Sequence, residues 1–174
     1  MLGIEIVILC AVFFLLCIFA TGTDSKNLQN YSSYPDEVQR RIREIPEYRD
    51  RFKEKSKVTA WIANFFLFFL LFLALGVFVR QEAFLPNFLA LFLLGQALNT
   101  FDLLVIDLLW WRNTPRIRFS KIPQKCLYQD SQKHFAAFLR AFIMYFLIAL
   151  IDGYLLTLFY RIFTPRYLLT RWIY

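Results

Sequence analysis

Four long apolar runs, separated by polar segments, dominate the pattern along this chain. They cover residues 2–21, 58–79, 86–111 and 135–163. A helix needs about 20 consecutive apolar residues to cross a bilayer core. Each run is long enough, and the fourth is longer than needed, so it should tilt or project. The pattern predicts four transmembrane helices. The first run lacks a basic leader and a small-residue cleavage site, so we expect it to be a retained span.

The longest polar segment, residues 22–57, predicts an amphipathic helical segment between the first and second spans. A hydroxyl, a proline and two acids at residues 33–37 are typical of a helix start. Val38, Ile42 and Ile45 then follow at helical spacing and form a narrow apolar stripe, which a proline interrupts. We interpret the segment as a pair of amphipathic helices on the inner membrane surface. The alternative is a docking surface for a cytoplasmic partner.

Composition excludes a soluble globular protein. Hydrophobic residues make up 59% of the chain, Phe alone contributes 21 residues, and the mean hydropathy is +0.47. Soluble domains are about 45–50% apolar. This chain has too little polar surface to cover a globule, so the excess must face lipid. The fold class is therefore an all-α membrane protein, with residues 1–174 forming a single membrane domain.

Positive charge is concentrated in the two longer polar segments. The net charge is +7, with nine Lys or Arg in residues 22–57 and six in residues 112–134. Arg80 is the single Lys or Arg in the turn between the second and third spans, and the C-terminal end contains three Arg. Two of these three lie in a tail of mixed aromatic and basic residues, which we interpret as an interfacial anchor. The positive-inside rule places both segments in the cytoplasm and both termini outside a cell membrane. This distribution fits membrane orientation, so no nucleic-acid partner is predicted.

Polar residues inside the spans are the candidate functional residues, because charge is costly within a bilayer. The candidates are Asp102, Asp107, Asp152, Arg140, Asn99, Gln96, Asn64 and His134. At about 100° per residue, those of the third span share one broad side of an α-helix. That side should face other helices rather than lipid.

Depth along the third and fourth spans predicts which candidates meet. Asp107 and Arg140 fall at a similar level near the inner face, where an ion pair would neutralise both charges. His134 lies at the same boundary and either reaches Asp107 or faces water. Helix rise places Asp152 about 18 Å above Arg140, level with Gln96 and Asn99.

Asp102 falls near mid-membrane, with Asn64 of the second span as a neighbour. Two interpretations of the acids remain open. In one, the Asp107–Arg140 pair fixes the helix register, and Asp102 and Asp152 make contacts between helices. In the other, the acids line a polar cavity as proton or cation sites.

Signatures of known catalytic and metal sites are missing from the sequence. It contains no Gly-rich phosphate loop, no HExxH and no GxSxG motif. The single His and three Cys show no metal-ligand spacing. We therefore predict no cofactor and no metal.

The stretch from Asn99 to Arg118, followed by Tyr128, Lys133 and His134, resembles small, uncharacterised multi-pass membrane proteins of bacteria. Tyr34-Pro35 with Glu37-Val38 is similar to the same group. The resemblance implies a four-helix membrane protein and brings no activity with it.

Three functions remain as hypotheses. The first is a transporter- or channel-like subunit in which Asp102, Asp107 and Asp152 line a polar route. The alternative is a non-catalytic accessory or scaffold component of a membrane complex. The second alternative is a lipid-modifying enzyme at the inner leaflet, with His134 and Asp107 as acid–base residues. Besides the lipid bilayer, we expect a membrane-protein partner or a homo-oligomer, because four helices make a thin bundle.

Overall fold

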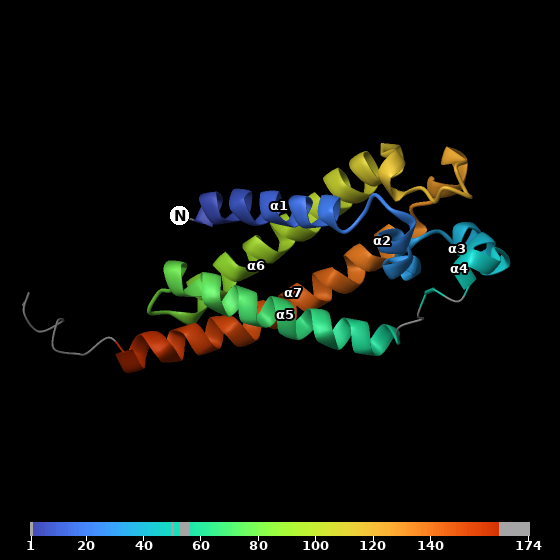
Figure 1. Ribbon diagram of the computed structural model, residues 1–174. Coiled ribbons are helices and arrows are strands. Elements are labelled where there is room, and N and C mark those ends of the chain that lie inside the picture. Colours follow the sequence, from blue (N-terminus) through green and yellow to red (C-terminus); the bar gives the residue numbers. More distant parts are fainter. Residues whose placement is uncertain (1, 50, 53–55, 164–174) are drawn as a thin grey trace, which may run out of the picture.

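Four long helices form the body of the protein. The computed structural model describes residues 2–49, 51–52 and 56–163, and for Lys57 it describes the backbone alone. The long helices are α1 (Leu2–Phe19), α5 (Lys57–Val79), α6 (Phe84–Phe101), which continues into η2 (Asp102–Trp111), and α7 (Gln132–Phe163) (Figure 1). All four spans are long and apolar enough to cross a membrane, which confirms the predicted class. The predicted interfacial anchor at residues 166–174 lies outside the described residues.

Helices α6 and α7 form the centre of the bundle. A Cβ atom added at Gly153 of α7 would lie 3.0 Å from the Phe88 backbone nitrogen, and one added at Gly95 of α6 would lie 2.8 Å from the Tyr145 Cβ. Lipid tails are as apolar as leucine, so membrane helices associate through close packing at small residues. Helix α1 packs against α6 and α5 packs against α7, so these two helices flank the central pair (Figure 1).

The C-terminal part of the third span is π-helical. Segment η2 has ten residues in this conformation, whereas most π-helical segments are single turns, often at functional sites. A π-helix bonds residues i and i+5, so residues five apart lie one turn apart on one face. Asp102 and Asp107 therefore share a face. The α-helical geometry assumed from sequence was wrong here, since it separates them by about 140°.

The two long polar segments fold together into one unit, here called the cap (residues 21–49 and 112–131). The first segment contributes α2 (Asp24–Gln29), η1 (Tyr31–Ser33), α3 (Asp36–Glu44) and α4 (Pro46–Arg49). The second contributes η3 (Pro115–Ile117) and η4 (Lys125–Tyr128). Their shared core, which includes Trp111 at the end of the third span, consists of Leu28, Tyr31, Tyr34, Val38, Ile42, Tyr48, Trp111, Ile117, Phe119, Ile122 and Tyr128.

The apolar stripe of α3 is buried inside the cap. Val38 and Ile42 are 0% exposed and Ile45 packs beside them. The predicted helix forms and ends before Pro46, but its apolar stripe is not free to lie on a membrane surface, because the cap covers it. The stripe packs instead on apolar residues of the second polar segment, which have no helical periodicity and so gave no signal in the sequence. The docking alternative stays a prediction.

Hydrogen bonds join the two halves of the cap. The Tyr34 hydroxyl donates to the Ile117 carbonyl oxygen at 2.8 Å in a buried position. The Asp24 carboxylate accepts from the Ser120 backbone N–H at 3.0 Å, and from the Tyr48 and Ser120 hydroxyls at 2.5 Å each. Partial burial alone would raise the pKa of Asp24, but the bonds from Ser120 and Tyr48 outweigh it and lower the pKa. The ionised carboxylate thus stabilises the junction.

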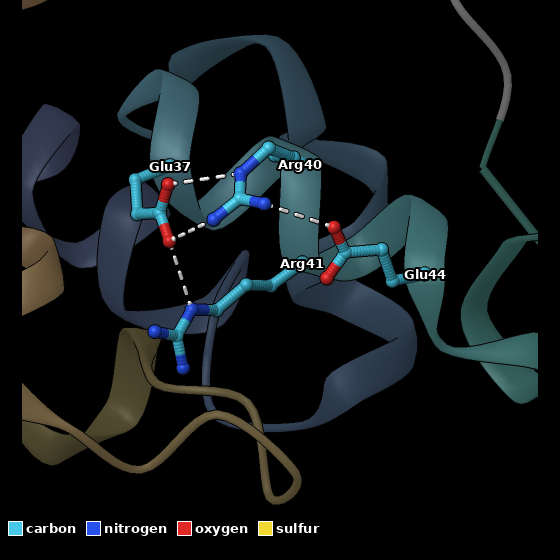
Figure 2. A network of polar contacts seen from close by, with 4 residues as sticks. All are labelled: Glu37, Arg40, Arg41 and Glu44. Carbon is cyan, nitrogen blue, oxygen red and sulfur yellow. Dashed lines mark hydrogen bonds and ion pairs between the residues drawn. The ribbon is translucent and has the colours of Figure 1, made fainter.

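The outer face of α3 carries a network of ion pairs in water. Glu37 binds Arg40 and Arg41, and Arg40 also binds Glu44 (Figure 2). Hydrogen bonds from Arg40 and Arg41 lower the pKa of Glu37 to about 2. Exposed ion pairs of this kind contribute little to stability. The network therefore marks the solvated side of α3, opposite its buried stripe.

Candidate functional site: a buried carboxylate–imidazole pair

A contact between a carboxylate and an imidazole joins the third and fourth spans where the bundle meets the cap. The His134 Nδ1 atom lies 2.9 Å from the Asp107 Oδ2 atom, and the side chains are 7% and 15% exposed. His134 lies in the first turn of α7, and Asp107 lies in η2. The sequence offered His134 as one of two partners for Asp107, and the structure selects it.

The second nitrogen of His134 is left without a partner. An ionised Asp107 only accepts hydrogen bonds, so Nδ1–H donates and a neutral imidazole keeps its lone pair on Nε2. This Nε2 atom is buried and has no hydrogen-bond partner in the part of the chain that the structure describes. The Trp111 Nε1 atom is also buried without a partner among the described residues, and the centroid of its ring lies 6.0 Å from that of the His134 ring. Buried polar atoms are nearly always satisfied, so two such atoms together suggest a site for another molecule.

A second carboxylate, Asp102, lies close to this pair. It interacts electrostatically with Asp107 and His134 but makes no hydrogen bond with any other described residue. Cys17 of α1 is within electrostatic range of both carboxylates, and Tyr145 of α7 is within range of Asp102. We call Asp102, Asp107 and His134 the acidic cluster. Three elements converge on it: α1, η2 and α7.

Two predicted neighbours do not join the acidic cluster. Arg140 is exposed and forms no ion pair with Asp107, so that prediction was wrong. It lies six residues beyond His134 on α7, about 240° around the helix, so the two side chains point to different sides. Asn64 of α5 is also exposed, and no contact with Asp102 supports its predicted place beside that acid.

Gln96 and Asn99 tie the third span to the fourth. The Gln96 side-chain amide donates to the Phe142 carbonyl oxygen at 3.3 Å, and that of Asn99 donates to the Phe138 carbonyl oxygen at 3.2 Å. Such bonds hold membrane helices in register. The two amides therefore act as structural contacts that position η2 against α7.

Asp152 lies far from the acidic cluster. It is 0% exposed, and neither carboxylate oxygen has a hydrogen-bond partner among the described residues. The next residue, Gly153, packs on Phe88, whereas Gln96 lies opposite Phe142. The predicted level beside Gln96 was therefore wrong by about 15 Å of helix rise, because the packing register of α6 and α7 cannot be read from span limits.

An open apolar groove of about 790 Å³ runs between α1 and the third span. Its lining residues include Phe14 of α1, and Ala97, Phe101 and Leu104 of the third span. Phe101 and Leu104 lie on either side of Asp102 in the sequence, so the groove runs along the part of the third span that carries Asp102, although no residue of the acidic cluster lines it. The sequence gave no sign of it, because groove residues and lipid-facing residues have the same composition.

The chemistry open to this site is proton transfer. An imidazole held by a carboxylate acts as a general acid or base. No group of three or more His, Cys, Asp or Glu in the described part of the chain is placed to hold a metal ion.

Comparison of the chain with protein-family models, with curated proteins and with solved structures finds no match. The resemblance to bacterial multi-pass membrane proteins therefore stays a prediction, and function has to be argued from the site itself.

Proposed function

We propose that this protein is a membrane-embedded enzyme that performs acid–base chemistry on an amphipathic molecule of the bilayer. One observation carries the proposal: Asp107 holds His134, whose buried Nε2 has no partner among the described residues. A carboxylate on Nδ1 fixes the tautomer and orientation of an imidazole, which leaves Nε2 to exchange a proton with a bound substrate.

The groove beside α1 supports a lipid-like substrate. Its lining is almost wholly apolar and it is open at the side, so a hydrocarbon chain can enter from the bilayer. We assign it to the chain of the substrate, because it runs along the part of the third span that carries Asp102. The head group would then lie beside Asp102 and His134. A helix of a second copy is the competing occupant, and native mass spectrometry of the purified protein would reveal it as a dimer.

We further propose that the cap lies in the cytoplasm, which puts the acidic cluster at the inner leaflet and both termini outside. The support is the excess of Lys and Arg in the two polar segments. Cys126 is exposed in the cap, whereas Cys10 and Cys17 lie in the first span. A membrane-impermeant maleimide should label Cys126 only in permeabilised cells, with Cys126→Ser as the unlabelled control. Labelling of intact cells would reverse the orientation.

The proposal is tested by lipid mass spectrometry of cells that express the protein. Wild type should change the abundance of at least one lipid class relative to cells without the protein. His134→Ala and Asp107→Asn should abolish this change, because each removes part of the proton-transfer pair. Arg140→Gln is the matched control, since Arg140 is exposed on the same helix. Identical lipid profiles for wild type and His134→Ala would refute the enzyme.

Asp152 favours a second candidate, a proton- or cation-coupled transporter. A fully buried carboxyl group without a partner among the described residues is a functional candidate inside a membrane. It lies 18 residues beyond His134, or about 27 Å of helix rise, so the two sites can be tested apart. Asp152→Asn should abolish proton flux into proteoliposomes if the protein is a transporter, and leave lipid profiles unchanged. Equal flux for wild type and variant would remove this candidate.

An accessory role with a membrane-protein partner is a further proposal, supported by the thinness of a four-helix bundle. Making Val38, Ile42 and Ile45 polar would not test it, because Val38 and Ile42 are core residues of the cap and their loss would disturb its fold. Mass spectrometry of proteins that co-purify in mild detergent tests it instead, and a clean monomer would count against it.

A further inference from the structure

We infer that the head group of the ligand carries a neutral hydroxyl group, bound between Trp111 Nε1 and His134 Nε2. The inference rests on the proposed function, because it names the chemical class of molecule that the same site accepts. It comes from the two unsatisfied nitrogen atoms and from the charge that surrounds them.

The two nitrogen atoms differ in what they need. An indole N–H can only donate a hydrogen bond, whereas the Nε2 of a neutral, Asp107-bound imidazole can only accept one. Both atoms are buried and unpartnered within the described residues, and their rings lie 6.0 Å apart at an angle of 67°. A hydroxyl group bound between the two rings would satisfy both atoms, since its oxygen would accept from Trp111 while its hydrogen donated to His134. A carbonyl or ether oxygen satisfies only Trp111.

Charge around the site favours a neutral head group over an anionic one. Asp102 and Asp107 both interact electrostatically with the site, and neither forms an ion pair with Lys or Arg of the described residues. Like charges this close in a medium of low dielectric repel strongly. Arg112, whose Nε atom is buried and has no partner among the described residues, follows Trp111 directly and would suit a phosphate. An anionic lipid therefore has to be among the probes.

The position of Trp111 is fixed by the cap. Its ring lies 5.3 Å from that of Tyr34, which is 0% exposed in the cap core. The indole is therefore held by packing independently of any ligand. Trp111→Phe removes the N–H donor and keeps an aromatic ring against Tyr34, with the loss of one ring of the indole.

Competition binding tests the inference on the full-length protein in mild detergent. Radiolabelled dioleoylglycerol is the bound probe, and unlabelled dioleoylglycerol, its O-methyl ether and dioleoyl phosphatidic acid are the competitors. All three have the same chains and differ only in the head group. The ether should compete about five-fold more weakly than the alcohol, because it lacks one hydrogen bond. Phosphatidic acid should compete more weakly still. An ether equal to the alcohol, or phosphatidic acid as the best competitor, would overturn the inference.

Three variants and one control variant assign the binding to this site. Trp111→Phe should weaken dioleoylglycerol binding about five-fold. His134→Phe should remove the difference between alcohol and ether. Ala97→Phe, which fills the groove, should weaken alcohol and ether equally, and Arg140→Gln should change nothing. If His134→Phe does not fold, Trp111→Phe and the wild-type competition series still test the inference. Unchanged binding by Trp111→Phe would overturn the inference.

The outcome separates this inference from the proposed function. Selective binding of the alcohol together with unchanged lipid profiles would refute the enzyme and keep the hydroxyl site. Altered lipid profiles without any preference for the alcohol would refute the hydroxyl site and keep the enzyme.

Discussion

The contact between Gly153 and Phe88 makes a sharp prediction about bundle stability. A Cβ atom at position 153 would lie 3.0 Å from the Phe88 backbone nitrogen and 3.1 Å from its Cα. Optimal separations between such atoms are about 3.5–4.0 Å. The obstacle is backbone, which cannot rotate away as a side chain does. Gly153→Ala must therefore push α6 and α7 apart locally and disturb the Asn87–Thr157 hydrogen bond one turn away.

The magnitude follows from two opposing effects. Replacing Gly by Ala inside a helix gains about 1 kcal/mol of helix propensity. Overpacking a tight contact costs about 1–3 kcal/mol. Gly3→Ala is the matched control, because a Cβ atom there would meet nothing within 4 Å. Gly3 lies in the first turn of α1, so comparing the two variants cancels only part of the propensity gain, and Gly153→Ala should be about 1–2 kcal/mol less stable than Gly3→Ala.

Unfolding by sodium dodecyl sulfate in mixed micelles, followed by circular dichroism, measures this difference. The midpoint for Gly153→Ala should fall at a lower mole fraction of the denaturing detergent than that for Gly3→Ala. Equal midpoints would refute the reasoning, because they would mean that α6 and α7 do not approach each other at Gly153.

Three further outcomes follow from the contacts described. Tyr34→Phe leaves the buried Ile117 carbonyl without its donor and should destabilise the cap by about 1–3 kcal/mol, seen as faster hydrogen exchange there. The folded-state pKa of Asp24 is lowered, so its stabilisation is complete above the unfolded pKa near 4 and is lost as the pH falls through the folded value. The melting temperature of the wild type should therefore fall further between pH 6 and pH 3 than that of Asp24→Asn. Asn99→Leu should cost about 0.6 kcal/mol in the detergent titration, because one bond to Phe138 is lost.

The spans could be predicted from the sequence because hydropathy over 20 residues is a local signal. The bounds of α5 and of the third span differ from prediction by at most two residues at each end. The burial of Val38 and Ile42 could also be predicted from their spacing. The surface that covers them could not, because the pairing of two polar segments about 75 residues apart leaves no local pattern in either one.

Parts of the site escaped prediction for geometric reasons. Asp107 and His134 were both candidates, but choosing between His134 and Arg140 as the partner of Asp107 required the rotation of α7. The alignment of Asp102 with Asp107 depends on the π-helical form of η2, which sequence propensities do not encode. The depth of Asp152 depends on the axial register in which α6 packs against α7, and close packing at glycines sets that register.

The shared core of the cap imposes an order on biosynthesis. The apolar stripe of α3 leaves the ribosome before the second and third spans, and its covering residue Ile117 follows Ile42 by 75 residues. At ordinary rates of translation this gap lasts on the order of 4–15 s. During that time Val38 and Ile42 can pack only on residues of the first polar segment, such as Leu28 and Tyr34. A nascent chain stalled before residue 112 would lack the second half of the cap. The apolar stripe of α3 would then stay accessible to chaperones and proteases on its side of the membrane.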